Sequence, residues 1–240
     1  MVNVLMGLAT SVIGGACVWL WERGKNARVL RRRAAFFGLV PGETCLLVIG
    51  NKYNVRGAAT HKDIRAVIEV ATLASQIGCD TVIESSDDFR GSNGDRTEYC
   101  IGGPLGAANV RTGGHLAAHL PGVRILPYGA DPESAAIAVG EHRFLFEHDR
   151  VEHTLVAKFT PPEATRPVVV ICGQSSLANQ AAIHHLTRNY REVAGRLASI
   201  ERFCIVIKVS DIGTYGYQRA HFLRDVTPEA FAPTAGGTPT

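Results

Sequence analysis

The sequence predicts a Rossmann-like α/β domain with a mostly parallel, mixed sheet in three layers, behind one N-terminal transmembrane helix. Two observations predict this architecture. Short apolar runs alternate with segments of helical periodicity, as they do in βαβ units. In addition, residues 2–21 contain no charged side chain and are mostly apolar. At 1.5 Å per residue such a segment matches the ~30 Å hydrocarbon core of a bilayer.

The predicted transmembrane segment ends in Trp19 and Trp21, and indole rings favour the membrane interface. A basic cluster follows, made of Arg23, Lys25, Arg28, Arg31, Arg32 and Arg33. A cleavable signal peptide has the reverse polarity, and the positive-inside rule places this cluster in the cytoplasm. We therefore expect residues 1–22 to anchor the protein in the cell membrane by a single pass. Residues 23–40 are then a basic juxtamembrane linker to a cytoplasmic domain.

Small residues recur at a four-residue spacing within the predicted anchor, at Gly7, Ser11 and Gly15. Such spacing lets two membrane helices approach closely. The segment is therefore compatible with a homodimer formed through the transmembrane helix.

The composition excludes some classes of protein. A hydrophobic fraction of 46% with 20% charged residues is typical of a folded globular chain and excludes wholesale disorder. Much of the net charge of +3 comes from the basic cluster, so we expect no nucleic-acid partner. The six cysteines form no CxxC pair, and reduced thiols are the simplest interpretation.

The cytoplasmic domain is expected over residues 41–225, with a disordered tail over residues 226–240 that is rich in Pro, Gly, Ala and Thr. Apolar runs predict strands at residues 45–50, 81–84, 99–102, 123–126, 168–172 and 203–209. Helical spacing predicts helices at residues 64–77, 107–120 and 177–197. Alternating residues at 144–146 and 154–159 predict an antiparallel hairpin, which makes the sheet mixed.

A strand–glycine–helix pattern occurs twice. Aligning Gly103 with Gly173 also aligns Asn109 with Asn179 and His115 with His185. The pattern favours an internal duplication over chance.

The same pattern predicts a ligand site. A glycine at a strand end lets a ligand approach the backbone, and the N-terminus of the next helix attracts phosphate or carboxylate. In open α/β sheets ligands bind at the carboxyl ends of the strands. The predicted ligand-binding residues are Gly50, Asn51, Gly102, Gly103, Asn109, Gly173, Gln174, Ser175, Ser176, Asn179 and Tyr215. The two asparagines either cap their helices or reach the ligand, and Tyr215 either stacks on a base or packs its own loop.

Three acids are the candidate catalytic residues: Glu84, Glu98 and Asp211. They are expected near the same strand ends, together with Asp63, Asp87 and Asp88. An acid there can bind ribose hydroxyls, or stabilise an oxocarbenium-like centre when an N-glycosidic bond is cut. Acids are also common in surface loops without any such role.

No metal site is expected, because His115 with His119 and His184 with His185 lack an evident third ligand. No motif identifies a cofactor.

The leading functional hypothesis is a membrane-anchored cytoplasmic domain that binds a nucleotide-like or other anionic small molecule and signals. A nucleoside or nucleotide N-glycosidase or transferase is the first alternative. A membrane-tethered scaffold for protein interactions is the second.

Overall fold

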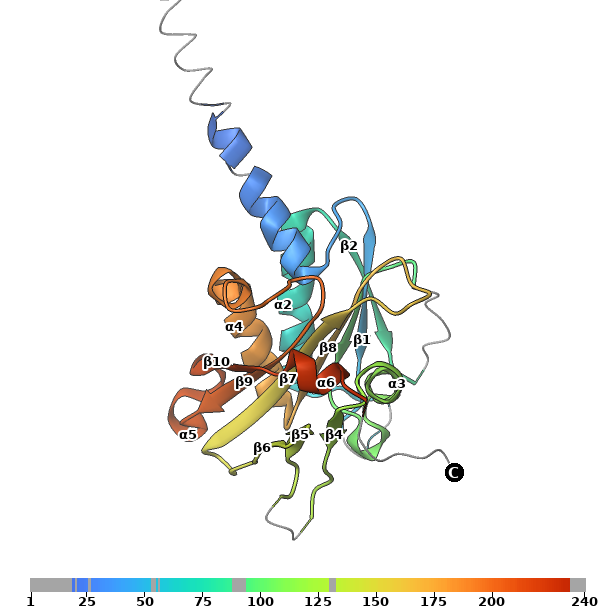
Figure 1. The fold of residues 1–240 in the computed structure, drawn as a ribbon, viewed down its shortest axis with the longest axis vertical. Helices are drawn as coiled ribbons and strands as arrows, with labels where there is room; N and C mark the ends of the chain where they lie inside the picture. The colour runs from blue at the N-terminus through green and yellow to red at the C-terminus, as the bar shows by residue number, and fades with distance from the viewer. Residues whose placement is uncertain are drawn as a thin grey trace, which may run out of the picture.

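The computed structural model contains a mixed α/β domain built on one seven-stranded sheet (Figure 1). The residues that it describes are 19, 21–25, 27–52, 55, 57–87, 94–129 and 133–233. The strands of this sheet are β1 (Thr44–Ile49), β2 (Asp80–Ser85), β3 (Glu98–Ile101), β7 (Val151–Phe159), β8 (Val168–Gly173), β9 (Phe203–Ser210) and β10 (Ala220–Asp225). They lie in the order β10-β9-β7-β8-β3-β1-β2.

Most of these strands run in one direction. The neighbours β2, β1, β3 and β8 pair in parallel, whereas β7 is antiparallel to both β8 and β9. β9 therefore runs the same way as β8, and only β7 and β10 are reversed. The carboxyl ends of five strands thus share one edge of the sheet, called here the carboxyl edge. The opposite edge is called the amino edge.

Two helices, α2 (His61–Ile77) and α4 (Ser176–Ala194), cover one face of the sheet together with the helical residues 27–37. The α2 helix begins at Thr60, whose hydroxyl accepts the N–H of Asp63 at 3.1 Å. It ends at Gly78, which has a φ of 91° that only glycine adopts without strain. Apolar residues of both helices pack on the central strands in the larger hydrophobic core.

The other face carries α3 (Val110–His119), α6 (Thr227–Phe231) and a second sheet. That sheet has three short antiparallel strands, β4 (Val123–Ile125), β5 (Ile137–Val139) and β6 (His142–Phe144). Short connections complete the described elements: η1 (Leu105–Ala107), α5 (Ile212–Tyr215) and η2 (Gly216–Gln218). The expected layered α/β architecture with a mixed, mostly parallel sheet is confirmed.

The α2 and α4 helices pack against each other although their crossovers step in opposite directions along the sheet. The chain moves from β1 to β2 through α2, and from β8 past β7 to β9 through α4. Both helices lie on the same face, so the two crossovers have opposite hands. Each helix follows the carboxyl end of a strand, α2 after β1 and α4 after β8. The N-termini of both helices therefore lie at the carboxyl edge, on the same face of the sheet.

The predicted hairpin is wrong. Residues 142–144 form β6, which pairs with β5 in the small sheet. β7 instead enters the main sheet between β8 and β9 and is buried along most of its length. A strand that is buried on both faces must pair its backbone groups with a strand on each side. This requirement outweighs hairpin formation with the segment that is nearest in the sequence.

Both predicted domain boundaries shift outwards. Phe36, Phe37 and Leu39, assigned to the linker, are buried in the larger core. Val226 and Ala230, assigned to the disordered tail, are also buried, at the start of α6 and within it. Residues 234–240 of the predicted tail lie outside the described residues.

The predicted transmembrane segment lies almost entirely outside the described residues. Among the helices of the described part of the chain, none has the length and apolar character needed to cross a bilayer. The expected helix pair around Gly7, Ser11 and Gly15 also falls outside these residues.

We expect Gly173→Ala to destabilise the protein by about 1–3 kcal/mol, as overpacked sites do. A Cβ at residue 173 would lie 2.8 Å from Asn179 Oδ1 and 2.9 Å from the Cβ of Ala178. At Gly103 the nearest atoms would be 3.5 and 3.6 Å away, so Gly103→Ala should change stability by no more than about 0.5 kcal/mol. Urea unfolding of the full chain in detergent measures both. Equal destabilisation by the two variants would contradict the close approach of α4 to β8.

Candidate functional site

A cleft of about 330 Å³ opens at the carboxyl edge. It lies where β1, β3 and β8 end and where α2 and α4 begin. The predicted ligand-binding residues that line it are Gly50, Asn51, Gly102, Gly103, Gly173, Gln174, Ser175, Ser176 and Asn179. Its volume is that of an ordinary small-molecule site. The folded chain thus gathers three separate segments of the sequence at one place.

The N-terminus of α4 forms part of the cleft wall. The hydroxyl of Ser175 caps it by accepting the N–H groups of Leu177 and Ala178 at 3.1 and 3.2 Å. Within the described part of the chain, no protein acceptor meets the backbone N–H of Gly103, Ser175 or Ser176. The cleft therefore presents free N–H donors beside the positive end of a helix dipole, an arrangement that suits an anion.

A loop held by Asn51 forms the opposite wall. Asn51 donates its side-chain amide to Asp87 at 2.6 Å and accepts the N–H of Gly57 at 3.0 Å. Its own N–H bonds the carbonyl of Ala108 at 2.6 Å. The adjacent Lys52 is exposed and also lines the cleft, where it adds positive charge.

Gln174 fixes the small sheet next to the cleft. Its side-chain amide donates to the carbonyls of Ala135 and Phe144 at 2.9 and 2.8 Å and accepts the N–H of His153 at 2.7 Å. These bonds use the side chain for structure, and the backbone N–H of Gln174 is also bonded, to the carbonyl of His153 at 3.0 Å. The hydroxyl of Tyr128 donates to the carbonyl of Gln174 and brings an aromatic ring to the cleft rim.

The two asparagines of the repeated pattern have different positions. Asn109 caps α3 by accepting the N–H of Thr112 at 2.9 Å, and it does not line the cleft. Its other bonds reach the ends of β3 and β1, and it is fully buried. Asn179 lies in the first turn of α4 and does line the cleft. Beyond the shared strand–glycine–helix order, the two units are not equivalent, because α3 and α4 lie on opposite faces of the sheet.

The predicted ligand-binding set lacks several residues that line the cleft: Lys52, Thr60, Asp63, Leu105, Ala108, Ile125, Tyr128 and Ala135. The order Thr60-x-x-Asp63 is a capping signal that marks the start of α2, so these two were detectable. Ile125 and Tyr128 were not, because no local pattern shows that β4 returns to the carboxyl edge.

Two buried carboxyl groups lie at this end of the domain. Burial raises the pKa of Asp63 despite hydrogen bonds from Thr60 and Asn179 that lower it. Burial likewise raises the pKa of Glu152 on β7, although Ser175 donates a hydrogen bond to it. Asp63 lines the cleft directly, whereas Glu152 is hydrogen-bonded to Ser175, which lines the cleft.

None of the three candidate catalytic acids lines the cleft. Glu84 lies on β2 at the edge of the sheet. Asp211 pairs with Arg219 at 2.6 Å on the exposed turn after β9, and Arg219 also covers the ring of Tyr215. Since β7 separates β9 from β8, neither Asp211 nor Tyr215 joins the glycine loops.

The expected position of Glu98 near the carboxyl strand ends is wrong, because Glu98 is the first residue of β3 and lies at the amino edge. It is buried and accepts two hydrogen bonds from Arg111, at 2.7 and 2.8 Å. His115 and Cys100 complete the cluster, each 3.0 Å from Oε1 of Glu98. Burial alone would raise the pKa of Glu98, but the hydrogen bonds from Arg111, His115 and Cys100 lower it to about 2.

The side chains of Glu98, Cys100 and His115 also lie close enough together to share a metal ion, a grouping that no local pattern in the sequence predicts. The guanidinium of Arg111 opposes this use, because it places a positive charge directly on the carboxylate. Burial also raises the pKa of the Cys100 thiol well above its usual value, and a metal binds the thiolate. The cluster is better described as a buried ion pair.

No protein-family model matches the chain, and a search of curated proteins finds no significant relative.

We expect Glu98→Gln to destabilise the protein by about 3 kcal/mol at pH 7, because Arg111 loses its buried partner. The pKa of Glu98 is lowered from 4.5 to about 2 on folding. Its contribution is therefore complete above pH 4.5 and is lost as the pH falls towards 2. The difference in free energy of unfolding between wild type and Glu98→Gln, measured with urea, should therefore shrink as the pH falls from 4.5 towards 2. The exposed Glu163→Gln, in the same groove, is the matched control. A gap that stays constant down to pH 3 would contradict the ion pair.

Proposed function

We propose that this domain binds a nucleotide-like or other anionic small molecule in the carboxyl-edge cleft. We further propose that residues 1–22 anchor it in a membrane, where ligand binding is a sensing event. One observation carries the binding proposal. Three strands and two helix N-termini meet at a single cleft, where the backbone N–H groups of Gly103, Ser175 and Ser176 have no acceptor among the described residues.

The walls of the cleft favour a ligand with an anionic end and an apolar end. Free N–H groups and Lys52 offer donors and positive charge. Leu105, Ile125 and Tyr128 offer apolar and aromatic surface. A phosphate attached to a planar base has both properties, and a half-exposed tyrosine is able to stack on the base.

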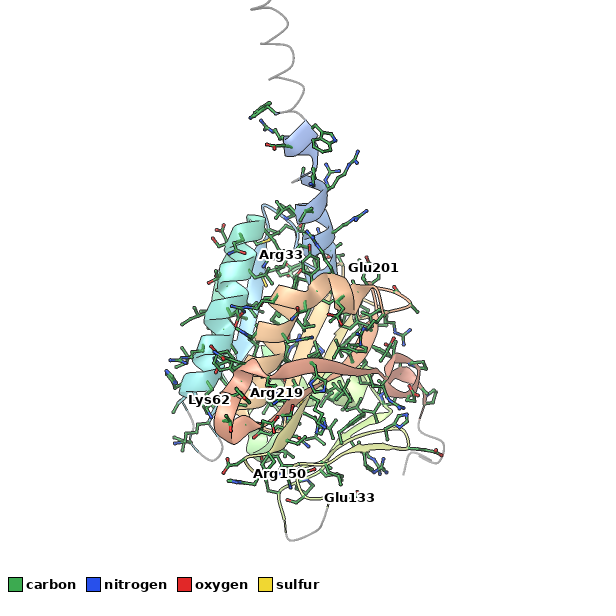
Figure 2. The ribbon with its side chains drawn as sticks, turned by 90° about the vertical axis from the view of Figure 1, so that its left-hand side faces the viewer. Arg33, Lys62, Glu133, Arg150, Glu201 and Arg219 are labelled. Atoms are coloured by element: carbon green, nitrogen blue, oxygen red, sulfur yellow. The ribbon has the colours of Figure 1, made fainter. Side chains whose placement is uncertain are left out.

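The packing of residues 27–39 supports an anchor that is rigidly connected to the domain. Lys158 donates to the carbonyl of Ala35, and Tyr99 to that of Phe37, both at 2.6 Å. Arg33 reaches Gln76 near the end of α2, while Lys62 lies at the other end of that helix (Figure 2). The anchor side and the cleft are thus at opposite ends of the domain, so a membrane at the anchor would leave the cleft open to solvent.

The other two functions receive less support. The N-glycosidase or transferase hypothesis relied on Glu84, Glu98 and Asp211, none of which lines the cleft. A protein scaffold has no need of a preformed cleft, and it predicts that no small molecule changes the stability of the protein.

The ligand is found by thermal unfolding of the full chain in detergent, screened against nucleotides, dinucleotides, cyclic nucleotides and inorganic phosphate. A ligand at a hundred times its Kd adds about 2.7 kcal/mol to the free energy of unfolding. For a domain of this size that raises Tm by roughly 5–10 °C. If no compound in the screen raises Tm, the result favours the protein-scaffold hypothesis.

We expect Ser176→Glu to weaken binding of the anionic hit roughly 10- to 100-fold, because it places a like charge in the cleft. Residue 176 is the first residue of α4, where a carboxylate is compatible with the helix dipole, so the fold should be retained. Ser176→Gln is the matched neutral control and should bind much more tightly than Ser176→Glu. Calorimetric titration measures all three proteins. Equal affinities for the Glu and Gln variants would place the anion elsewhere.

A further inference from the structure

Asp63 differs from the other buried acids of the domain. The residue is 6% exposed and lines the cleft. Thr60 donates to Oδ2 at 2.7 Å, and Asn179 donates to Oδ1 at 2.9 Å. Both donors are neutral, and among the described residues no lysine, arginine or histidine forms an ion pair with Asp63.

Comparison with Glu98 shows that Asp63 lacks a positively charged partner among the described residues. Glu98 is also buried, and its charge is balanced by the guanidinium of Arg111. A carboxylate has about four sites that accept hydrogen bonds, and the two neutral donors leave Asp63 about half satisfied. A buried charge in this condition is costly unless further donors reach it. The open side of Asp63 is the cleft, so those donors belong to the ligand.

The position of Asp63 restricts which groups of a ligand are able to supply these hydrogen-bond donors. Asn179, which binds Asp63, lies one helical turn, about 5.4 Å, from the free N–H groups at the start of α4. A ligand that spans both places carries its anionic group at Ser175 and Ser176 and hydrogen-bond donors a few ångströms away. A second anionic group at Asp63 would be repelled, whereas neutral hydroxyls fit.

We infer that the cleft is selective for a ribose-bearing phosphate, whose vicinal hydroxyls donate hydrogen bonds to Asp63 while its phosphate meets the N-terminus of α4. This inference rests on the proposed function and narrows it from anions in general to ribonucleotides. Removing one hydroxyl should then leave part of the buried carboxylate unsatisfied. A hydrogen bond to a charged group is worth enough to give a loss on the order of tenfold to a hundredfold in affinity.

The test titrates the full chain in detergent with the four ribonucleoside 5′-monophosphates, their 2′-deoxy and 3′-deoxy forms, and inorganic phosphate. Each titration is repeated with Asp63→Asn, which keeps an acceptor for Asn179 and nearly the same shape. Asp80→Asn is the control, because Asp80 is exposed at the amino end of β2 and does not line the cleft. Circular dichroism and Tm establish that all three proteins are folded.

The expected result is a ribose preference of at least tenfold in the wild type and in Asp80→Asn that collapses in Asp63→Asn. Affinity for the deoxy forms should change little between the three proteins. Equal binding of ribo and deoxy forms by the wild type would overturn this inference and leave the proposed anion site intact. A ribose preference that survives in Asp63→Asn would also overturn it, since another group would then read the hydroxyls. Failure of every phosphate probe to bind the wild type would refute both the proposed function and the inference.

Discussion

The side chain of Asn179 joins three of the elements whose ends form the cleft. Its Oδ1 accepts the N–H of Gly173 at 2.7 Å, and its Nδ2 donates to Asp63 at 2.9 Å. Asn179 is 2% exposed, so breaking either bond would leave a buried polar group unpaired. β8, α4 and α2 are therefore held together at their cleft ends without a ligand. The close approach requires a glycine at 173, because a side chain there would occupy the space of Asn179.

The two edges of the main sheet have opposite chemistry. At the amino edge two buried charged side chains have protein partners: Lys158 binds the carbonyls of Ala35 and Ile200, and Glu98 binds Arg111. At the carboxyl edge backbone donors and one carboxylate face an open cleft. The amino edge thus holds the helix that leads to the N-terminus, and the carboxyl edge is left for a ligand. Both α2 and α4 run between these ends, and Tyr190 near the end of α4 packs on Phe36 with ring centroids 5.9 Å apart.

The sequence located the glycine loops of the cleft, but none of the three candidate catalytic acids lines it. The ends of buried parallel strands are marked locally by an apolar run and a glycine, and their meeting at one edge follows from parallel pairing. No comparable local pattern predicts whether an acidic residue lies at the amino or the carboxyl end of a strand. Glu98 precedes its strand's apolar residues and so lies at the wrong edge, while Asp211 follows a strand that β7 separates from the others. Asp63 belongs to a helix start, and only the packing of α2 against α4 brings it to Asn179.

The sequence by itself determined the α/β class, the positions of the buried strands β1, β3, β8 and β9, and the glycine loops that follow the first three. These depend on hydrophobic periodicity and local backbone freedom, which neighbouring residues decide. Only the tertiary structure decided that β7 enters the main sheet, that α2 and α4 share one face, and that residues 34–39 and 226–231 belong to the packed domain. Those outcomes depend on burying apolar surface and pairing backbone groups between segments far apart in the chain, and no local pattern records that competition.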